Sequence, residues 1–317
     1  MHPWNVPLFE ALRQRAGRLP HALLIHGPRG IGKAALAEHI ARFLLCEAAD
    51  GRPCGRCEGC RWFAAGSHPD FRRLEPEALA AEPPVDLAED GEAPARRAKP
   101  SLDIKVEQVR ELAGFLGVGS HRGRARVALV HPAEDMNPNA ANALLKALEE
   151  PPAGAVFLLV SHRADRLLPT IRSRCVAVAV PLPPREAALA WLSGQGVPKA
   201  DRWLAYAGGA PLRALECAAN APTLERLLAQ PGPVEDRDEL ALLAEALQKV
   251  ALDRALGAFG LAPKYRTGGP APDPAQARAW LAYARYMGEQ RLLCRHPLNP
   301  KLFSAEMLAS MPKGDLG

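Results

Sequence analysis

Short apolar runs alternate with helix-like segments along the first 180 residues of the chain. Apolar positions recur at helical spacing between Leu102 and Leu116, where Val106, Val109 and Leu112 share one face. The extended runs predict β-strands at Ala22–His26, Phe71–Leu74, Arg126–His131, Val156–Ser161 and Val176–Val180. This alternation of strands and helices predicts an α/β fold for the first part of the chain.

The remainder of the chain is expected to be helical. Prolines interrupt it at 181–184, directly after the last predicted strand, and a small helical segment then runs over 185–217. A longer helical segment follows over 223–311, with a Gly/Pro-rich break at 267–274. These boundaries predict three domains: 1–180, α/β; 181–220, small and helical; and 221–317, all-helical.

One segment inside the α/β part carries no apolar periodicity. Residues 75–100 are rich in Pro, Ala and charged side chains, and they predict an exposed insertion that is disordered or nearly so.

Composition narrows the class of protein. Of the 317 residues, 48% are hydrophobic and only 5% aromatic, which favours a helix-rich protein with a real core. The net charge of +5 permits contact with nucleic acid without demanding it. The sequence contains no apolar run long enough to cross a membrane and no signal peptide, so we expect a cytoplasmic protein without a membrane partner.

A degenerate phosphate-binding loop follows the first predicted strand. The run from Gly27 to Ala34 reads GPRGIGKA, which supplies Gly27, Gly30, Gly32 and Lys33 of the P-loop pattern G-x-x-x-x-G-K-[ST]. The hydroxyl residue that would ligate Mg²⁺ is replaced by Ala34. The loop therefore keeps the shape of a nucleotide site without its metal ligand.

A second metal-handling element is also missing. A working P-loop ATPase carries acidic residues at the end of a second strand, to hold the Mg²⁺ shell and to orient water. Here the corresponding strand is followed by His131 and Pro132. Glu134 and Asp135 come three and four residues later, where capping or solvated carboxylates are the better interpretation. The two losses together predict a chain that does not hydrolyse ATP.

Four of the seven cysteines form a predicted metal site. Cys46, Cys54, Cys57 and Cys60 lie in a polar, glycine-rich segment, and the last three are separated by two residues each. Four thiolates satisfy a tetrahedral Zn²⁺ and leave no position for water. We therefore expect a structural zinc ion rather than a catalytic one.

Several segments, taken in order, resemble one known family. These are GPRGIGKAALA, the four-cysteine segment, AANALLKALEEPP within 139–152, and LLPTIRSRC over 167–175. On physics alone Arg172 and Arg174 would be ordinary surface arginines. In this context the chain resembles the clamp-loader branch of the AAA+ family. The resemblance is good over about the first 215 residues, and the C-terminal segment shares only the helical character of the family.

The resemblance implies both a fold and a function. It implies a RecA-like α/β domain with a zinc module, a helical lid and a helical collar that holds a pentamer together. Arg174 would be an arginine finger for ATP on the neighbouring subunit, and Arg213 would be the sensor arginine of the lid. The position at which ATPase members of the family place a polar sensor residue would fall near Ser161 or His162. The implied partners are the gamma or tau and delta subunits of bacterial DNA polymerase III in a hetero-pentamer, with the sliding clamp and primed DNA reached through the complex.

Within that family, the departures favour a stator that does not hydrolyse ATP. The family resemblance implies that its motor subunits have an intact P-loop and an Asp-Glu pair on the second strand. This chain has Ala34 and His131 at those places. Three alternatives remain open at this stage. The chain could be the ATP-hydrolysing motor subunit itself, it could bind nucleotide without hydrolysing it, or it could be a zinc-ribbon protein that binds nucleic acid. A basic run at Arg122, Arg124 and Arg126 has water as its default environment.

Overall fold

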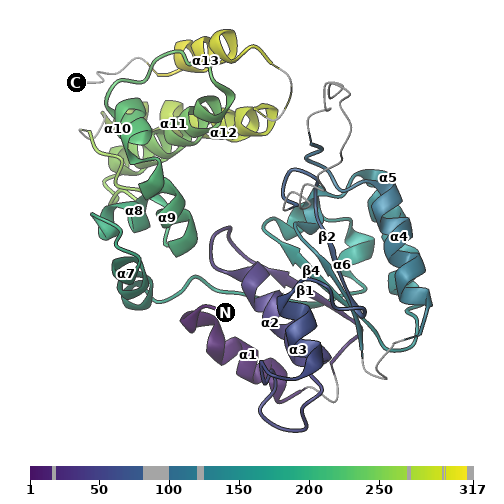
Figure 1. Cartoon of the computed structure of the whole chain (residues 1–317). Helices are drawn as coiled ribbons and strands as arrows, with labels where there is room; N and C mark the ends of the chain where they lie inside the picture. Colours follow the sequence, from purple (N-terminus) through teal and green to yellow (C-terminus); the bar gives the residue numbers. More distant parts are fainter. Residues whose placement is uncertain are drawn as a thin grey trace, which may run out of the picture. The chain divides into compact units, whose positions relative to one another are not determined.

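The structure is a computed structural model that describes residues 1–15, 19–80, 100–119, 125–269, 273–294, 296 and 298–312. Two compact units make up the chain, Met1–Leu182 and Pro183–Gly317 (Figure 1). Most of the predicted insertion, at 81–99, lies outside the described residues, as do Arg122 and Arg124.

A five-stranded sheet forms the centre of the first unit. The order of its strands is β2-β3-β4-β1-β5, and every neighbouring pair is parallel. The strands are β1 (Ala22–His26), β2 (Phe71–Leu74), β3 (Arg126–Val130), β4 (Ala155–Ser161) and β5 (Val176–Ala179). Each predicted strand is confirmed, with ends that differ by at most one residue. Because all strands run the same way, their carboxyl ends share one edge of the sheet.

Helices cover both faces of this sheet (Figure 1). On one face α4 and α5 pack together over a cluster that includes Leu24, Phe157 and Leu159, and on the other face α2 packs against β3 and β4. The helices are α1 (Val6–Arg13), α2 (Lys33–Leu45), α3 (Glu58–Ala64), α4 (Val106–Gly117), α5 (Pro138–Glu149) and α6 (Pro169–Arg172). The α/β P-loop domain predicted from the sequence is thereby confirmed.

Helix α4 begins later than the predicted start at Leu102. Ile104 forms an isolated bridge with Met136, and its backbone N–H donates to the carbonyl of Asp135 at 2.8 Å. An extended residue held in this way cannot also take helical dihedral angles, so the helix begins at Val106.

Arg126 corrects the water-facing interpretation of the basic run. The side chain is buried, with Nε 3.3 Å from Oδ1 of buried Asp70, and Nη1 donates to the carbonyl of Phe115. The guanidinium also lies 4.7 Å from the centre of the Phe115 ring. Arg126 is thus part of the packing between β3 and α4.

The two ends of the 75–100 insertion meet in the described structure. The backbone N–H of Ala78 donates to the carbonyl of Ser101 at 3.0 Å. The carboxylate of Glu77 accepts from the N–H of Ser101 at 2.9 Å and from Nζ of Lys105 at 2.7 Å. The insertion therefore leaves and re-enters the domain through a closed neck.

The second unit is all-helical, as predicted. Its helices are α7 (Arg185–Gly194), α8 (Ala200–Tyr206), α9 (Pro211–Ala219), α10 (Ala221–Ala229), α11 (Arg237–Ala258), α12 (Ala277–Leu293) and α13 (Pro300–Ala309). It contains two apolar clusters, and α10 contributes Leu224 to one and Leu227 to the other. The interruption between α11 and α12 is wider than the predicted break at 267–274. Asp253 fastens part of it by accepting from the N–H groups of Tyr265 and Thr267.

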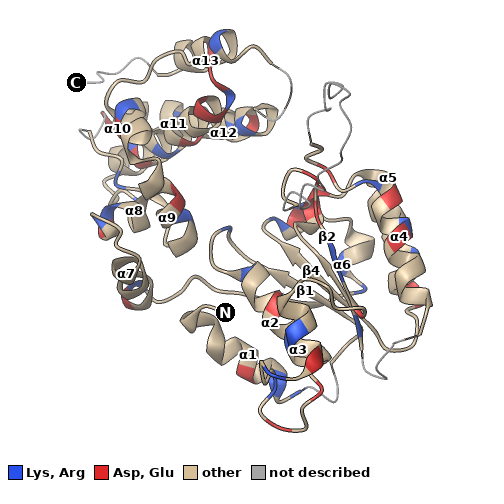
Figure 2. Cartoon of the chain, viewed as in Figure 1, with Lys and Arg blue, Asp and Glu red and all other residues tan. Residues whose placement is uncertain are grey.

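Basic and acidic residues are interspersed in both units. The helices α2, α5 and α11 each carry basic and acidic residues (Figure 2). Across the described part of the chain, no helix combines the length and the apolar character needed to cross a membrane.

Candidate functional site

The P-loop lies at the carboxyl edge of the sheet, between the end of β1 and the start of α2. Gly27, Gly30 and Gly32 have φ angles of 147°, 82° and 81°, which residues with a side chain rarely adopt. A Cβ atom on Gly27 would lie 2.4 Å from the carbonyl oxygen of Val180. The predicted glycines therefore have a steric role here, since the chain leaving β5 passes directly beside the loop.

Lys33 points back into the loop that precedes it. Its Nζ donates to the carbonyls of Gly27 at 2.8 Å and Pro28 at 2.5 Å, and the residue is buried. Burial lowers the pKa of Lys33 to about 8, although nearby Glu134 opposes the shift. The loop's own carbonyls thus occupy part of the donor capacity that would otherwise face a phosphate.

The N-terminal residues brace this loop, a feature that the sequence analysis missed. The indole N–H of Trp4 donates to the carbonyl of Ile31 at 2.9 Å, and buried Asn5 donates to the same carbonyl at 3.1 Å and to that of Gly32 at 3.3 Å. A Cβ on Gly32 would lie 2.3 Å from the ring of His2. No periodicity or motif marks the segment in the sequence, because the contacts join side chains to the backbone of a distant loop.

Two histidines occupy the ends of the neighbouring strands. His131 follows β3 and His162 follows β4, and their ring centres are 5.4 Å apart in an edge-to-face arrangement. Burial is the main cause that lowers their pKa values, to about 4 for His131 and about 3 for His162. Both rings are therefore neutral at pH 7, and His131 stands where an ATPase would carry a carboxylate.

Glu134 is held by the backbone. One carboxylate oxygen accepts from the N–H of His162 at 2.9 Å. Glu134 is therefore held by the backbone that follows β4 and is not a solvated carboxylate. Ser161, at the predicted sensor position, is buried, and its hydroxyl accepts from the N–H of Arg163 at 3.1 Å.

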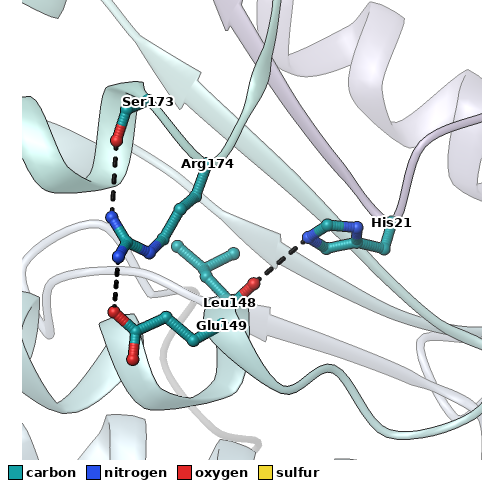
Figure 3. A pocket seen from close by; sticks show the side chains of 5 residues that line it. All are labelled: His21, Leu148, Glu149, Ser173 and Arg174. Atoms are coloured by element: carbon teal, nitrogen blue, oxygen red, sulfur yellow. Dashed lines mark hydrogen bonds and ion pairs between the residues drawn. The ribbon is translucent and has the colours of Figure 1, made fainter.

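Arg174 lies in a separate part of the first unit, at the edge of an open pocket of about 630 Å³. Its Nη1 donates to the carbonyl of Thr170 at 2.9 Å. Figure 3 shows its contacts with the hydroxyl of Ser173, at 3.4 Å from Nη1, and with Oε1 of Glu149, at 2.6 Å from Nη2. About a third of the side chain, 34%, is exposed. The pocket is completed by Ser173, Leu148 and His21. An arginine in this position is accessible to a ligand presented from outside the chain.

The four predicted metal ligands come together. The Sγ atoms of Cys46, Cys54, Cys57 and Cys60 all lie within 4.8 Å of one another. Backbone N–H groups point at the sulfurs: Cys54 donates to Cys46, Cys57 to Cys54 and Cys60 to Cys57, each at 3.4 Å. Backbone N–H groups of Arg56 and Cys57 lower the pKa of Cys54 to about 6, whereas burial raises the pKa of Cys60. Four convergent sulfurs are a donor set that can hold a metal ion.

The segment around these cysteines is shaped for close approach. The side chain of Cys57 caps the N-terminus of α3, and a Cβ on Gly59 would lie 2.8 Å from the carbonyl oxygen of Leu45. The start of α3 therefore packs directly against the end of α2, which Cys46 follows.

Arg213, the predicted sensor arginine, is engaged within the second unit. It donates to Glu216 at 2.6 Å and to the buried carboxylate of Glu245 at 2.5 Å. Lys249 donates to the other oxygen of Glu245 at 2.5 Å, and these cations hold the pKa of Glu245 at about 2 despite burial. Arg213 thus connects α9 to α11 through an ion-pair network.

Comparison with known proteins places these features in a family. The family model described as "DNA polymerase III, delta subunit" matches residues 7–183, which include the P-loop, the cysteine cluster and Arg174. The chain belongs to this family.

Individual relatives carry related names. The DNA polymerase III subunit delta' of Pseudomonas aeruginosa is 46% identical over 220 residues, which are 68% of this chain and 60% of that protein. The chain thus spans less than two thirds of that relative's length. The DNA polymerase III subunit tau of Escherichia coli is 35% identical over 50% of this chain and 21% of its own length. A gamma subunit-related protein from Thermotoga maritima aligns over 95% of this chain and 97% of its own, at 18% identity and a TM-score of 0.48.

Proposed function

We propose that the chain is the delta'-type stator of a DNA polymerase III clamp loader. It would assemble with gamma or tau and delta subunits in a hetero-pentamer that loads the sliding clamp onto primed DNA. In this role it hydrolyses no ATP itself and supplies Arg174 to ATP bound by the neighbouring subunit.

One observation carries the proposal: the nucleotide site lacks the groups that would bind Mg²⁺ and orient water, and yet the same unit presents an accessible arginine. Ala34 and His131 stand where a hydroxyl and a carboxylate would bind Mg²⁺ and orient water, and Lys33 is bonded to its own loop. Arg174 lies elsewhere in the same unit, partly exposed beside an open pocket. A permanently charged, planar guanidinium suits the charge that develops on a transferring phosphoryl group.

The remaining assignments follow from the same proposal. Zn²⁺ on the four cysteines would be structural, since four sulfurs leave no position for water. Residues 181–220 would form the lid and 221–317 the collar, with α10 joining the two apolar clusters of the second unit.

The test is the replacement Arg174→Ala in the reconstituted clamp loader. Folding, zinc content and assembly should be unchanged, because a partly exposed arginine contributes little to the core. ATP hydrolysis and clamp loading should fall. A finger contributes roughly 10³–10⁵-fold at the site it serves, but other ATP sites in the complex keep working, so the loss is partial.

Two further variants sharpen this test. Arg174→Lys should recover little activity, because an ammonium group cannot reproduce the forked geometry of a guanidinium. Arg172→Ala removes an exposed arginine two positions away and should leave the rate unchanged. A complex that carries Arg174→Ala and loads clamps at full rate under limiting ATP would refute the finger assignment.

A further inference from the structure

Glu149 faces the guanidinium of Arg174 across the edge of the pocket. The two side chains come from different elements, since Glu149 is the last residue of α5 and Arg174 follows the short helix α6. Their charged groups approach to 2.6 Å, and Figure 3 shows the carboxylate directed at the guanidinium. The Glu149 side chain is 50% exposed, so burial does not explain its position.

The position of Glu149 is unfavourable for the helix that carries it. The carboxyl end of a helix has a partial negative charge, which a carboxylate in the last turn opposes. An exposed ion pair adds little stability in return. A residue that gains so little for the fold, and whose carboxylate contacts the guanidinium of Arg174, is a candidate for a role in function.

The end of α5 is fixed in place. His21, just before β1, makes a hydrogen bond of 3.2 Å to the carbonyl of Leu148, and the Leu148 side chain is buried in the core. The prolines at 151–152 prevent the helix from continuing. Glu149 is therefore attached to a rigid point of the domain.

We propose that Glu149 is a positioning residue for Arg174. Its carboxylate pairs with Nη2 at 2.6 Å, while the carbonyl of Thr170 and the hydroxyl of Ser173 accept from Nη1, and together they hold the guanidinium in one orientation. Nε of Arg174 makes no hydrogen bond to the described residues, so its N–H is among the donors of the guanidinium that are left for an incoming phosphate. A guanidinium that is ordered in advance loses less freedom when the phosphate arrives. This inference rests on the proposed function of Arg174.

The experiment compares Glu149→Ala, Glu149→Gln and the matched control Glu150→Ala in the reconstituted clamp loader. Glu150 is the adjacent, exposed carboxylate of the same turn. Glu149→Ala should lower kcat for ATP, by up to about 10-fold at the affected site, and leave KM unchanged, because the finger acts in the transition state. Glu149→Gln should recover part of the rate, since its amide oxygen still accepts a hydrogen bond. Glu150→Ala should match the unmodified complex.

A double variant gives the decisive readout. In the Arg174→Ala background, Glu149→Ala should cause no further loss, because a residue that acts through Arg174 has nothing left to position. Additive losses would overturn the proposal, as would a Glu149→Ala complex that behaves like Glu150→Ala. Faster hydrolysis in Glu149→Ala would overturn it too, by showing that the carboxylate restrains the finger. If Arg174→Ala itself has no effect, the proposed function fails rather than the pairing alone.

Discussion

The histidines that end β3 and β4 show how single residues change the chemistry of a nucleotide-binding fold. At His131 an uncharged ring stands where a carboxylate would draw in a metal ion, and His162 packs edge-on against it. Lys33 and Arg29 are close enough to add to the effect of burial and to disfavour the protonated form of either ring. Both imidazole rings therefore favour the neutral form.

This preference predicts a loss of stability in mild acid. An unfolded histidine has a pKa near 6.5, while the folded values are about 4 for His131 and about 3 for His162. The unfolded chain therefore binds more protons below pH 6.5, and stability is lost as the pH falls through that range towards the folded pKa values. Between pH 7 and pH 5 each histidine should account for about 2 kcal/mol.

Urea unfolding at the two pH values measures this loss. The variant His131→Gln/His162→Gln should lose clearly less stability on acidification than the unmodified chain. Lys33 does not contribute to this difference between pH 7 and pH 5, since its pKa of about 8 means that it titrates above neutral pH. An equal loss in both proteins would show that the rings are not the source.

At the scale of single elements, the cysteine segment joins α2 to α3. The last residues of α2 lead into Cys46, and Cys57 caps α3, so a bound ion would tie two helices to one point. The segment's convergent N–H groups already direct the sulfurs inward.

Purified protein should contain about one zinc per chain. Cys57→Ser should lower both the zinc content and the midpoint of thermal unfolding of the first unit, because metal binding stabilises the folded segment. Cys175→Ser, at a half-buried cysteine outside the cluster, is the control that should retain the metal. Metal analysis of well-folded protein that finds no zinc would contradict the assignment.

The sequence predicted the strands and the cysteine cluster far better than it predicted the contacts between distant side chains. Strands such as Ala22–His26 are buried on both faces, so their apolar runs are unambiguous, and the spacing of Cys54, Cys57 and Cys60 states its chemistry directly. The pairing of Glu149 with Arg174 depends on where two helix ends meet in space. The burial of Arg126 depends on Asp70, far away in the chain, and no local pattern reports it.

At the scale of the whole molecule, segments from both ends of the first unit support the P-loop. Trp4 and Asn5 hold its backbone from the N-terminal side, and Val180 passes beside Gly27. The hydrogen bond from the N–H of Val180 to the carbonyl of His26, at 2.8 Å, adds a further restraint. The backbone of the loop is therefore supported by contacts within the first unit.

The isolated chain should therefore show no ATP hydrolysis above background, with or without DNA, in a phosphate-release assay. Neither Mg²⁺ nor the attacking water would find its usual protein partners. Ala34→Thr restores one hydroxyl and should not rescue turnover, since His131 still replaces the carboxylate. Robust hydrolysis by the unmodified chain would favour the motor-subunit alternative.

The closed neck of the 75–100 insertion has a practical consequence for protein engineering. Hydrogen bonds of Ser101 with Ala78 and Glu77 join the two ends of the insertion. The entropy of closing a loop changes slowly with length, by about 0.6 kcal/mol for each doubling. A fluorescent tag, an affinity peptide or a shorter linker can therefore replace residues 81–99 at small cost to the sheet. The position offers an attachment point on the α/β unit that lies outside the P-loop, the cysteine segment and the Arg174 region in the sequence.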